Sequence, residues 1–130
     1  MQFLNPPGWP RPKGYSNGVS ARGRMVFTAG VIGWDEREEI RSDDLAEQVR
    51  QALTNIVAIL RAGDAGPEHI VRMTWYVTDA EEYRASAKEI GAAYRAVIGS
   101  HYPAMAVVQV ARLVEARAKV EIEATAVVPE

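Results

Sequence analysis

The chain has 130 residues, of which 48% are hydrophobic, and a formal net charge of −2 at pH 7. This is the length of one ordinary domain, so we expect a single domain over residues 1–130. No basic block is long enough to neutralise a phosphate backbone, and nucleic-acid binding is therefore not expected. The absence of cysteine excludes disulfides, thiolate catalysis and cysteine metal sites.

The first residues of the chain predict neither a leader nor regular structure. Residues 1–13 contain four prolines, which fix φ and remove backbone donors, so this segment is predicted to be an irregular arm without helix or central strand. It has no positively charged stretch followed by an apolar run, and no apolar stretch in the chain approaches membrane-spanning length. We therefore expect a soluble, cytoplasmic protein without membrane contact.

Two strands are predicted next. Residues 15–19 form a short first strand, and Arg22-Gly23 has the composition of a hairpin turn. Residues 24–32 are rich in β-forming side chains and are predicted as one strand. Gly30 lies within it, and a strand glycine often indicates a bulge or the close approach of another backbone or a ligand.

A helix follows. Ser42 is its predicted N-cap, with two aspartates favourably placed in the first turn. Apolar residues then recur at steps of three and four, as one buried helix face requires. They are Leu45, Val49, Leu53, Ile56, Val57 and Leu60. The helix is predicted to end at Gly63 or Gly66, and Pro67 prevents it from resuming.

The second half of the chain predicts one more helix and three strands. The strand at Ile70–Val77 has few interruptions, and a helix begins after it at Thr78 or Asp79. The apolar stripe of that helix consists of Tyr83, Ala87, Ile90, Tyr94 and Val97. Residues 105–111 and 119–128 are predicted as the last two strands.

This order of elements predicts an α+β or α/β fold with a mixed sheet. Both helices connect strands, so we expect them to cover the same face of the sheet. The other face then stays uncovered and partly apolar in a single chain. An exposed apolar surface of that size predicts self-association.

The last strand carries two acids on one face. In residues 119–124, alternation directs Val120 and Ile122 to one side and Glu121 and Glu123 to the other. Two acids on a nearly terminal strand are typical of a solvated edge, and they are also what a functional carboxylate would require. The pattern alone leaves both interpretations open.

Several motifs resemble the RidA (YjgF/YER057c/UK114) family. The C-terminal motif comprises Tyr102-Pro103-Ala104, VVQVARL at 107–113 and KVEIEATA at 119–126. GYSNGV at 14–19, FTAG at 27–30 and QALTNI at 51–56 fit in order and spacing. The resemblance covers essentially the whole chain after the arm, and the C-terminal motif is long and specific.

The resemblance implies a chorismate-mutase-like α+β fold, with a mixed six-stranded sheet and two helices on one face. It also implies a homotrimer in which the sheets line a central barrel and the active sites lie in clefts between neighbouring subunits. The family's chemistry is the hydrolysis of small-molecule enamines or imines to keto acids and ammonia. No metal ion or organic cofactor is implied.

Carried over by position, three residues match the family's site. Tyr15 corresponds to its site tyrosine, Gly30 to the glycine whose strand backbone faces the ligand, and Glu121 to the glutamate that positions the attacking water. Catalysis is therefore expected of Glu121, as general base, and of Tyr15, as a donor to the ligand. Backbone groups from Gly30 through Val31 to Ile32 are expected to bind the substrate's polar end.

Three positions depart from the family. Met105 stands where an arginine normally holds the substrate carboxylate, Val107 where many members have cysteine, and Lys88 where asparagine is common. The loop at 114–118 also differs. Losing a charged hydrogen bond costs roughly 1.5–3 kcal/mol, or about ten- to a hundredfold in affinity. Small 2-imino acids are therefore expected to bind poorly, and a larger, more apolar or aromatic-derived substrate is favoured.

Replacements for the missing arginine stay open. Lys88, Arg72 and Arg112 are candidate cations, although charges near a sheet are mostly rim residues. Trp34 and Trp75 are candidates for stacking on a planar substrate, with packing the favoured interpretation for Trp75. Two functions remain possible: a RidA-like deaminase with a non-standard substrate, and a non-catalytic trimer that binds small molecules or a protein in the same clefts. The two histidines are too few for a metal site.

Overall fold

The computed structural model describes residues 1–130. Its strands are β1 Gln2–Leu4, β2 Gly18–Ser20, β3 Arg24–Phe27, β4 Val31–Ile32, β5 Ile70–Val77, β6 Ala104–Gln109 and β7 Val120–Val128. Its helices are α1 Leu45–Ala62, α2 Ala80–Ala85 and α3 Ala87–Val97, and Pro67–His69 forms a 3-10 turn. The predicted α+β class is confirmed.

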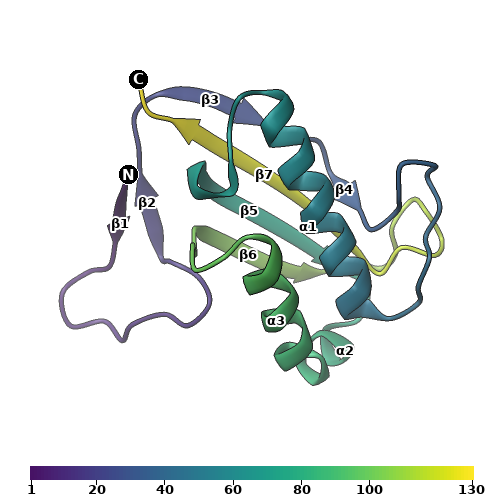
Figure 1. Cartoon of the computed structure of the whole chain (residues 1–130). Coiled ribbons are helices and arrows are strands. Elements are labelled where there is room, and N and C mark those ends of the chain that lie inside the picture. The colour runs from purple at the N-terminus through teal and green to yellow at the C-terminus, as the bar shows by residue number, and fades with distance from the viewer.

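The sheet is mixed and has five strands in place of the expected six. The strand order is β3-β7-β5-β6, with β4 also paired to β7, and β1 and β2 form a separate two-stranded ribbon (Figure 1). β5 and β6 run parallel, whereas β7 is antiparallel to its neighbours. The strands β6 and β4 therefore lie at opposite edges of the sheet.

The first helix begins two residues later than its predicted cap. Asp44 is the N-cap, and its carboxylate accepts the backbone N–H of Glu47 at 3.1 Å. The prediction of Ser42 as the cap was wrong because its hydroxyl instead accepts the N–H of Asp44 at 3.0 Å, in the turn before the helix. Gly63 ends the helix, as predicted.

The second predicted helix is two helices. Asp79, one of the two predicted start residues, caps α2 by accepting the N–H groups of Glu81 and Glu82. Ser86 ends α2 with φ −98° and ψ 10°, outside the usual helical range, and α3 begins directly after it. The apolar stripe is thereby shared between a short exposed helix and a longer one that packs on the sheet.

The core lies between the sheet and the helices α1 and α3, which cross one of its faces (Figure 1). β5 supplies Met73, Trp75 and Val77 to this core, and β7 supplies Val120 and Ile122. All five side chains are at most 1% exposed, as alternation on two central strands requires. The expectation that the helices cover a single face is therefore met by α1 and α3.

The predicted strand over residues 24–32 is interrupted. Phe27 pairs with Thr125 and Val31 pairs with Ile122, so four steps along this segment oppose three along β7. The extra residue makes a β-bulge. Thr28 holds it in place, because its hydroxyl accepts the N–H of Ala124 at 3.0 Å while its own N–H binds the carbonyl of that residue at 2.9 Å.

The N-terminal arm is not wholly irregular. Residues 2–4 pair with Gly18–Ser20, which corrects the prediction for that segment and shifts the first strand from 15–19. A long loop joins the two strands (Figure 1). Ser16 ties its end to the start of β6, since its N–H binds the carbonyl of Pro103 at 3.0 Å and its hydroxyl binds that of Tyr102 at 2.5 Å. The side chain of Tyr15 is thereby brought beside β6.

The other face of the sheet carries both apolar and polar side chains. Met25 and Phe27 are 56% and 63% exposed there, and Tyr76, Glu121 and Glu123 share the same face. The expected uncovered and partly apolar face is therefore present in the single chain, and self-association through it stays a prediction. No helix is long and apolar enough to cross a membrane.

Candidate active site

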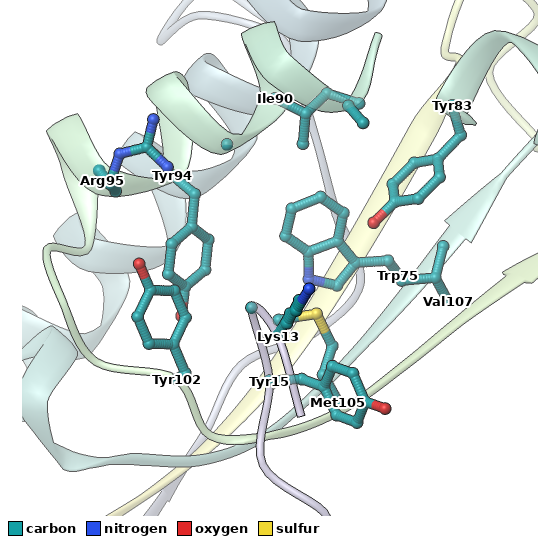
Figure 2. A pocket seen from close by; sticks show the side chains of 13 residues that line it. Lys13, Tyr15, Trp75, Tyr83, Ile90, Tyr94, Arg95, Tyr102, Met105 and Val107 are labelled. Atoms are coloured by element: carbon teal, nitrogen blue, oxygen red, sulfur yellow. The ribbon is translucent and has the colours of Figure 1, made fainter. Parts of the chain in front are cut away.

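An aromatic pocket lies at the β6 edge of the sheet, beneath α3 (Figure 2). It has a volume of about 530 Å³. Its lining residues are Lys13, Gly14, Tyr15, Trp75, Tyr83, Ala87, Ile90, Gly91, Tyr94, Arg95, Tyr102, Met105 and Val107. A cavity of this size with mostly apolar walls is typical of a small-molecule site.

The charge of the aromatic pocket is entirely positive. Lys13, from the N-terminal loop, and Arg95, from α3, are its only charged lining residues. Neither makes an ion pair within the chain, and both are exposed. Two cations without a nearby carboxylate favour an anionic group at the mouth of the pocket.

The walls are an aromatic cluster. Figure 2 shows Tyr94 and Tyr102 on one side of the pocket and Trp75 and Tyr83 on the other. The rings of Tyr94 and Tyr102 are stacked, with centroids 5.5 Å apart and an angle of 14° between planes. The rings of Trp75 and Tyr94 lie 6.4 Å apart. Burial raises the pKa of Tyr94 well above its usual range, and its hydroxyl donates to the carbonyl of His101.

One polar atom of this pocket has no partner. The side chain of Trp75 is 1% exposed, and its Nε1–H is buried without a hydrogen bond. It is the only such side-chain atom in the protein. A buried donor left unpaired costs about 1–3 kcal/mol, which is why such groups are rare in folded proteins.

An acidic groove lies at the opposite edge of the sheet, between β4 and α1. It has a volume of about 760 Å³ and no lysine or arginine in its lining. Its lining residues are Gly30, Val31, Ile32, Trp34, Asp35, Glu36, Glu38, Gln51, Thr54, Asn55, Ala58, Ile59, Val114, Glu115 and Glu121. A hydrogen bond from Arg41 holds the pKa of Asp35 below its usual range. No three carboxylate or imidazole groups converge as a metal site would require.

Within the acidic groove, Glu121 lies directly against Gly30. A Cβ added at position 30 would lie 2.8 Å from the carboxyl carbon of Glu121, and closer still to one of its oxygens. A glycine at that position therefore makes room for the carboxylate. The neighbouring acid on the same face, Glu123, is engaged differently, because it accepts a hydrogen bond of 2.6 Å from the hydroxyl of Tyr76. Glu121 makes no ion pair.

The pocket and the groove lie at different edges of the sheet, and Met105 and Glu121 lie on different faces of it. Met105 pairs with the buried Met73, so its side chain lies on the helix-covered face, whereas Glu121 lies on the other face. β5 also separates the strands that carry them, which places their backbones about 10 Å apart. A single chain cannot bring these two side chains together on one small ligand.

The predicted site residues therefore fall into two groups. Tyr15, Met105 and Val107 line the aromatic pocket. Glu121 lines the acidic groove together with Gly30, Val31 and Ile32. Lys88 lines neither cavity: it is exposed on α3, one position away from the helix face that lines the pocket. The alternative cations Arg72 and Arg112 also lie outside both cavities, while Trp34 lines the groove and Trp75 the pocket.

Sequence reasoning missed Lys13 and Arg95 altogether, together with the acids that surround Glu121. One signal was available for Arg95, because it follows Ala87 and Gly91 at steps of four along α3, and all three line the pocket. The acid-rich segment 35–39, interrupted by Arg37, was the corresponding signal for the groove, which Asp35, Glu36 and Glu38 line. Lys13 carries no such signal, since the loop geometry alone places it.

Known proteins share this sequence and this fold. The family model described as endoribonuclease L-PSP matches residues 10–128. A 2-iminobutanoate/2-iminopropanoate deaminase of Salmonella typhimurium is 36% identical over 87% of this chain and 86% of its own length. A RutC family protein of Pyrococcus horikoshii is 37% identical over 90% of each.

Two solved structures extend the likeness to the fold. The Rid-family protein YyfB of Yersinia pestis, described as of unknown function, has a TM-score of 0.85 at 30% identity and 98% coverage of both chains. Escherichia coli TdcF with bound serine has a TM-score of 0.71 at 34% identity, over 98% of this chain and 99% of that one. The chain therefore belongs to the endoribonuclease L-PSP family, the RidA (YjgF/UK114) proteins that its motifs predicted.

Proposed function

We propose that the protein is a hydrolytic deaminase of enamines or imines whose active site is completed by two copies of the chain in a homotrimer. One copy supplies the aromatic pocket, and its neighbour supplies Glu121 and the acidic groove. The observation that carries this proposal is the separation of the predicted site residues onto two surfaces that one chain cannot join. The relatives named as imine deaminases support the reaction type.

The reaction requires a water, a base and a leaving amine. An enamine is first protonated on carbon to give the imine. Water then adds to the carbon of the C=N bond and loses a proton to Glu121, while the nitrogen takes up a proton. The resulting carbinolamine breaks its C–N bond, which leaves a ketone and ammonia. No redox step or organic cofactor is needed, because the net reaction converts the imine and one water molecule into a ketone and ammonia.

The substrate is non-standard in this proposal. Met105 offers neither the charge nor the paired donors with which an arginine holds a carboxylate. It offers a soft apolar wall instead, among several aromatic side chains. Tyr15 lines the pocket and is 42% exposed, and its proposed role is to orient the ligand through its hydroxyl. The walls thus suit a larger and more apolar molecule than a three- or four-carbon imino acid.

Complementation between two defective variants tests the shared site. Glu121→Gln removes the base from the groove. Gly91→Leu fills the pocket from α3, where the first added carbon would meet only the flexible end of Arg95, at 3.3 Å. Each variant alone is expected to be inactive on an imine that the wild type hydrolyses. Chains mixed at random before assembly should regain activity at about a quarter of the sites, those that pair an intact pocket with an intact groove.

Three results would contradict parts of this proposal. A stable monomer in light scattering at micromolar concentration removes the homotrimer. Mixed trimers that regain no activity show that pocket and groove do not cooperate between chains. A trimer that binds imines or keto acids without turning any of them over is the non-catalytic binder, the function favoured by Met105 alone.

A further inference from the structure

We propose that the indole N–H of Trp75 takes over the task of the missing arginine by binding the carboxylate of an aryl-substituted 2-imino acid. Lys13 supplies the positive charge that balances this carboxylate. This inference rests on the proposed deaminase function and names its substrate class. It also changes the interpretation of Trp75, for which the sequence favoured simple packing.

The unpaired donor is the first observation. Trp75 Nε1–H is buried without a partner in a wall of the aromatic pocket. An N–H buried among apolar side chains gains more from an incoming acceptor than an exposed one does, because it has no water to give up. A carboxylate oxygen is the strongest acceptor that a small organic substrate offers.

The position of this donor is the second observation. Trp75 pairs with Val107 across β5 and β6, two residues along β6 from Met105, where the arginine of the family would begin. Figure 2 shows the nitrogen edge of the indole on the side of the pocket where Lys13 and Met105 lie, with Arg95 across from it beside Tyr94. Lys13 therefore supplies positive charge on the same side as the donor.

The wall of the pocket opposite Trp75 determines which side chain of the ligand is preferred. Tyr94 and Tyr102 form a stacked pair, whose exposed surface suits an offset or edge-on contact with a third ring. No acid lines the pocket, so an anionic ligand meets no repulsion there. Together the donor, the cation and the aromatic wall describe an aryl-substituted 2-imino acid.

In the proposed binding event, Met105 is the side chain that moves. Less than 1 Å² of the Trp75 nitrogen is open to water in the free protein, so an acceptor reaches it only when a covering group shifts. Methionine has three rotatable bonds and adapts easily to a changed neighbour. An arginine at this position would carry its own donors, whereas a methionine can give way to a ligand.

Binding of stable keto acids tests the inference without turnover. Phenylpyruvate, the product expected from an aromatic imino acid, should bind at least tenfold more tightly than pyruvate in calorimetric titrations. Trp75→Phe should weaken the binding of phenylpyruvate by about ten- to a hundredfold. It should change the binding of phenylacetone, which lacks the carboxylate, far less. Trp9→Phe, on the exposed arm, is the matched control.

Two further measurements keep the inference testable if Trp75→Phe does not assemble. The wild type has three indole N–H resonances, which Trp9→Phe and Trp34→Phe assign by elimination, and phenylpyruvate should shift that of Trp75 downfield. Lys13→Met should weaken the binding of phenylpyruvate only a few-fold, because an exposed charge contributes little. It should also reduce the salt dependence of this binding, because salt screens the charge that the variant lacks.

The outcomes separate this inference from the deaminase proposal. An unmoved Trp75 resonance at saturating phenylpyruvate, or equal affinity for pyruvate, overturns the role of Trp75 even if imines are hydrolysed. Conversely, phenylpyruvate bound through Trp75 by a protein that hydrolyses no imine overturns the deaminase and leaves the binding site standing.

Discussion

The aromatic pocket and the acidic groove are opposite in almost every physical respect. The pocket is walled by rings, carries only positive charge and contains a buried donor without a partner. The groove contains five acids, including Glu121, and no lysine or arginine. The difference shows that the two cavities are complementary in charge and polarity. In the proposed shared site, the pocket would supply apolar contact and an anion site, and the groove would supply a base for water.

This contrast also suggests how a site can be divided between subunits. Opposite charges at two edges of one sheet attract each other when copies of the chain meet, and they set the orientation of the contact. In the proposed trimer, a ligand with a carboxylate at one end and a reactive nitrogen at the other would lie across the junction, with each end near charge of the opposite sign. Substitutions in the groove and in the pocket test the two halves of the proposed site separately.

The largest expected effect comes from removing the groove's base. Glu121→Gln keeps the size of the side chain but removes the proton acceptor, and should lower turnover by about 10²–10⁴-fold. Glu123→Gln is the matched control, because Glu123 shares the strand face but is hydrogen-bonded to Tyr76. Turnover and assembly would be measured for both variants. Equal losses in two intact trimers, or full activity in Glu121→Gln, would remove Glu121 from the mechanism.

Displacing the base should cost less than removing it. In Gly30→Ala the added Cβ collides with the Glu121 carboxylate, the movable end of a flexible side chain. The carboxylate should shift while the fold survives, and a misplacement on the order of 1 Å lowers the rate by up to about 10²-fold. The prediction is a loss of turnover without a matching fall in the midpoint of thermal unfolding. An unchanged rate would show that the base does not need its place beside the glycine.

On the pocket side, an arginine should restore small substrates. The wild type is expected to hydrolyse 2-iminobutanoate or 2-aminoacrylate weakly or not at all, because Met105 cannot hold their carboxylate as an arginine does and their short side chains gain nothing from the aromatic wall. Met105→Arg should raise this activity by about ten- to a hundredfold, the worth of one charged hydrogen bond. Steady-state rates on both substrates provide the measurement. Wild-type rates equal to those of arginine-bearing relatives would place the anion site elsewhere.

The smallest effect concerns stability at high pH. Burial raises the pKa values of Tyr94 and Tyr83 above the ordinary value of about 10. The folded protein therefore holds these protons more tightly than the unfolded chain, so its free energy of unfolding falls as the pH rises above about 10. Urea unfolding between pH 8 and 11 should show this decline. Tyr94→Phe should make it shallower, and an equally steep decline in that variant would assign it to other groups.

Local pattern was enough to predict most of the fold. The strand at Ile70–Val77 and the end of α1 at Gly63 follow from β-propensity and from glycine at a helix terminus. The bulge at Thr28 was not predicted because it depends on a side chain entering the ladder of a strand almost one hundred residues away. The pairing of residues 2–4 was missed because proline content masks a short strand beside it.

The candidate site was predictable only as far as the family motifs reach. They selected Tyr15, Gly30 and Glu121, and the structure places each of these in a cavity. They gave no indication that Trp75 has an unpaired nitrogen, since the burial of one atom depends on tertiary packing that no local pattern encodes. Lys88 shows the opposite limit, because a position inferred from the family resemblance lies outside both cavities when the helix turns its other face inward.

The hydrogen bonds of Ser16 have a consequence for protein quality control. β6 ends the sheet, and an open edge strand can template the addition of strands from unfolded chains, which is how aggregates and fibrils begin. Ser16 bridges to Ala104, the first residue of β6, and thereby covers that end of the edge strand. A protease that clipped the N-terminal loop should leave the core between the sheet and the helices unchanged but uncover the start of β6. We expect such nicked molecules to precipitate before they unfold.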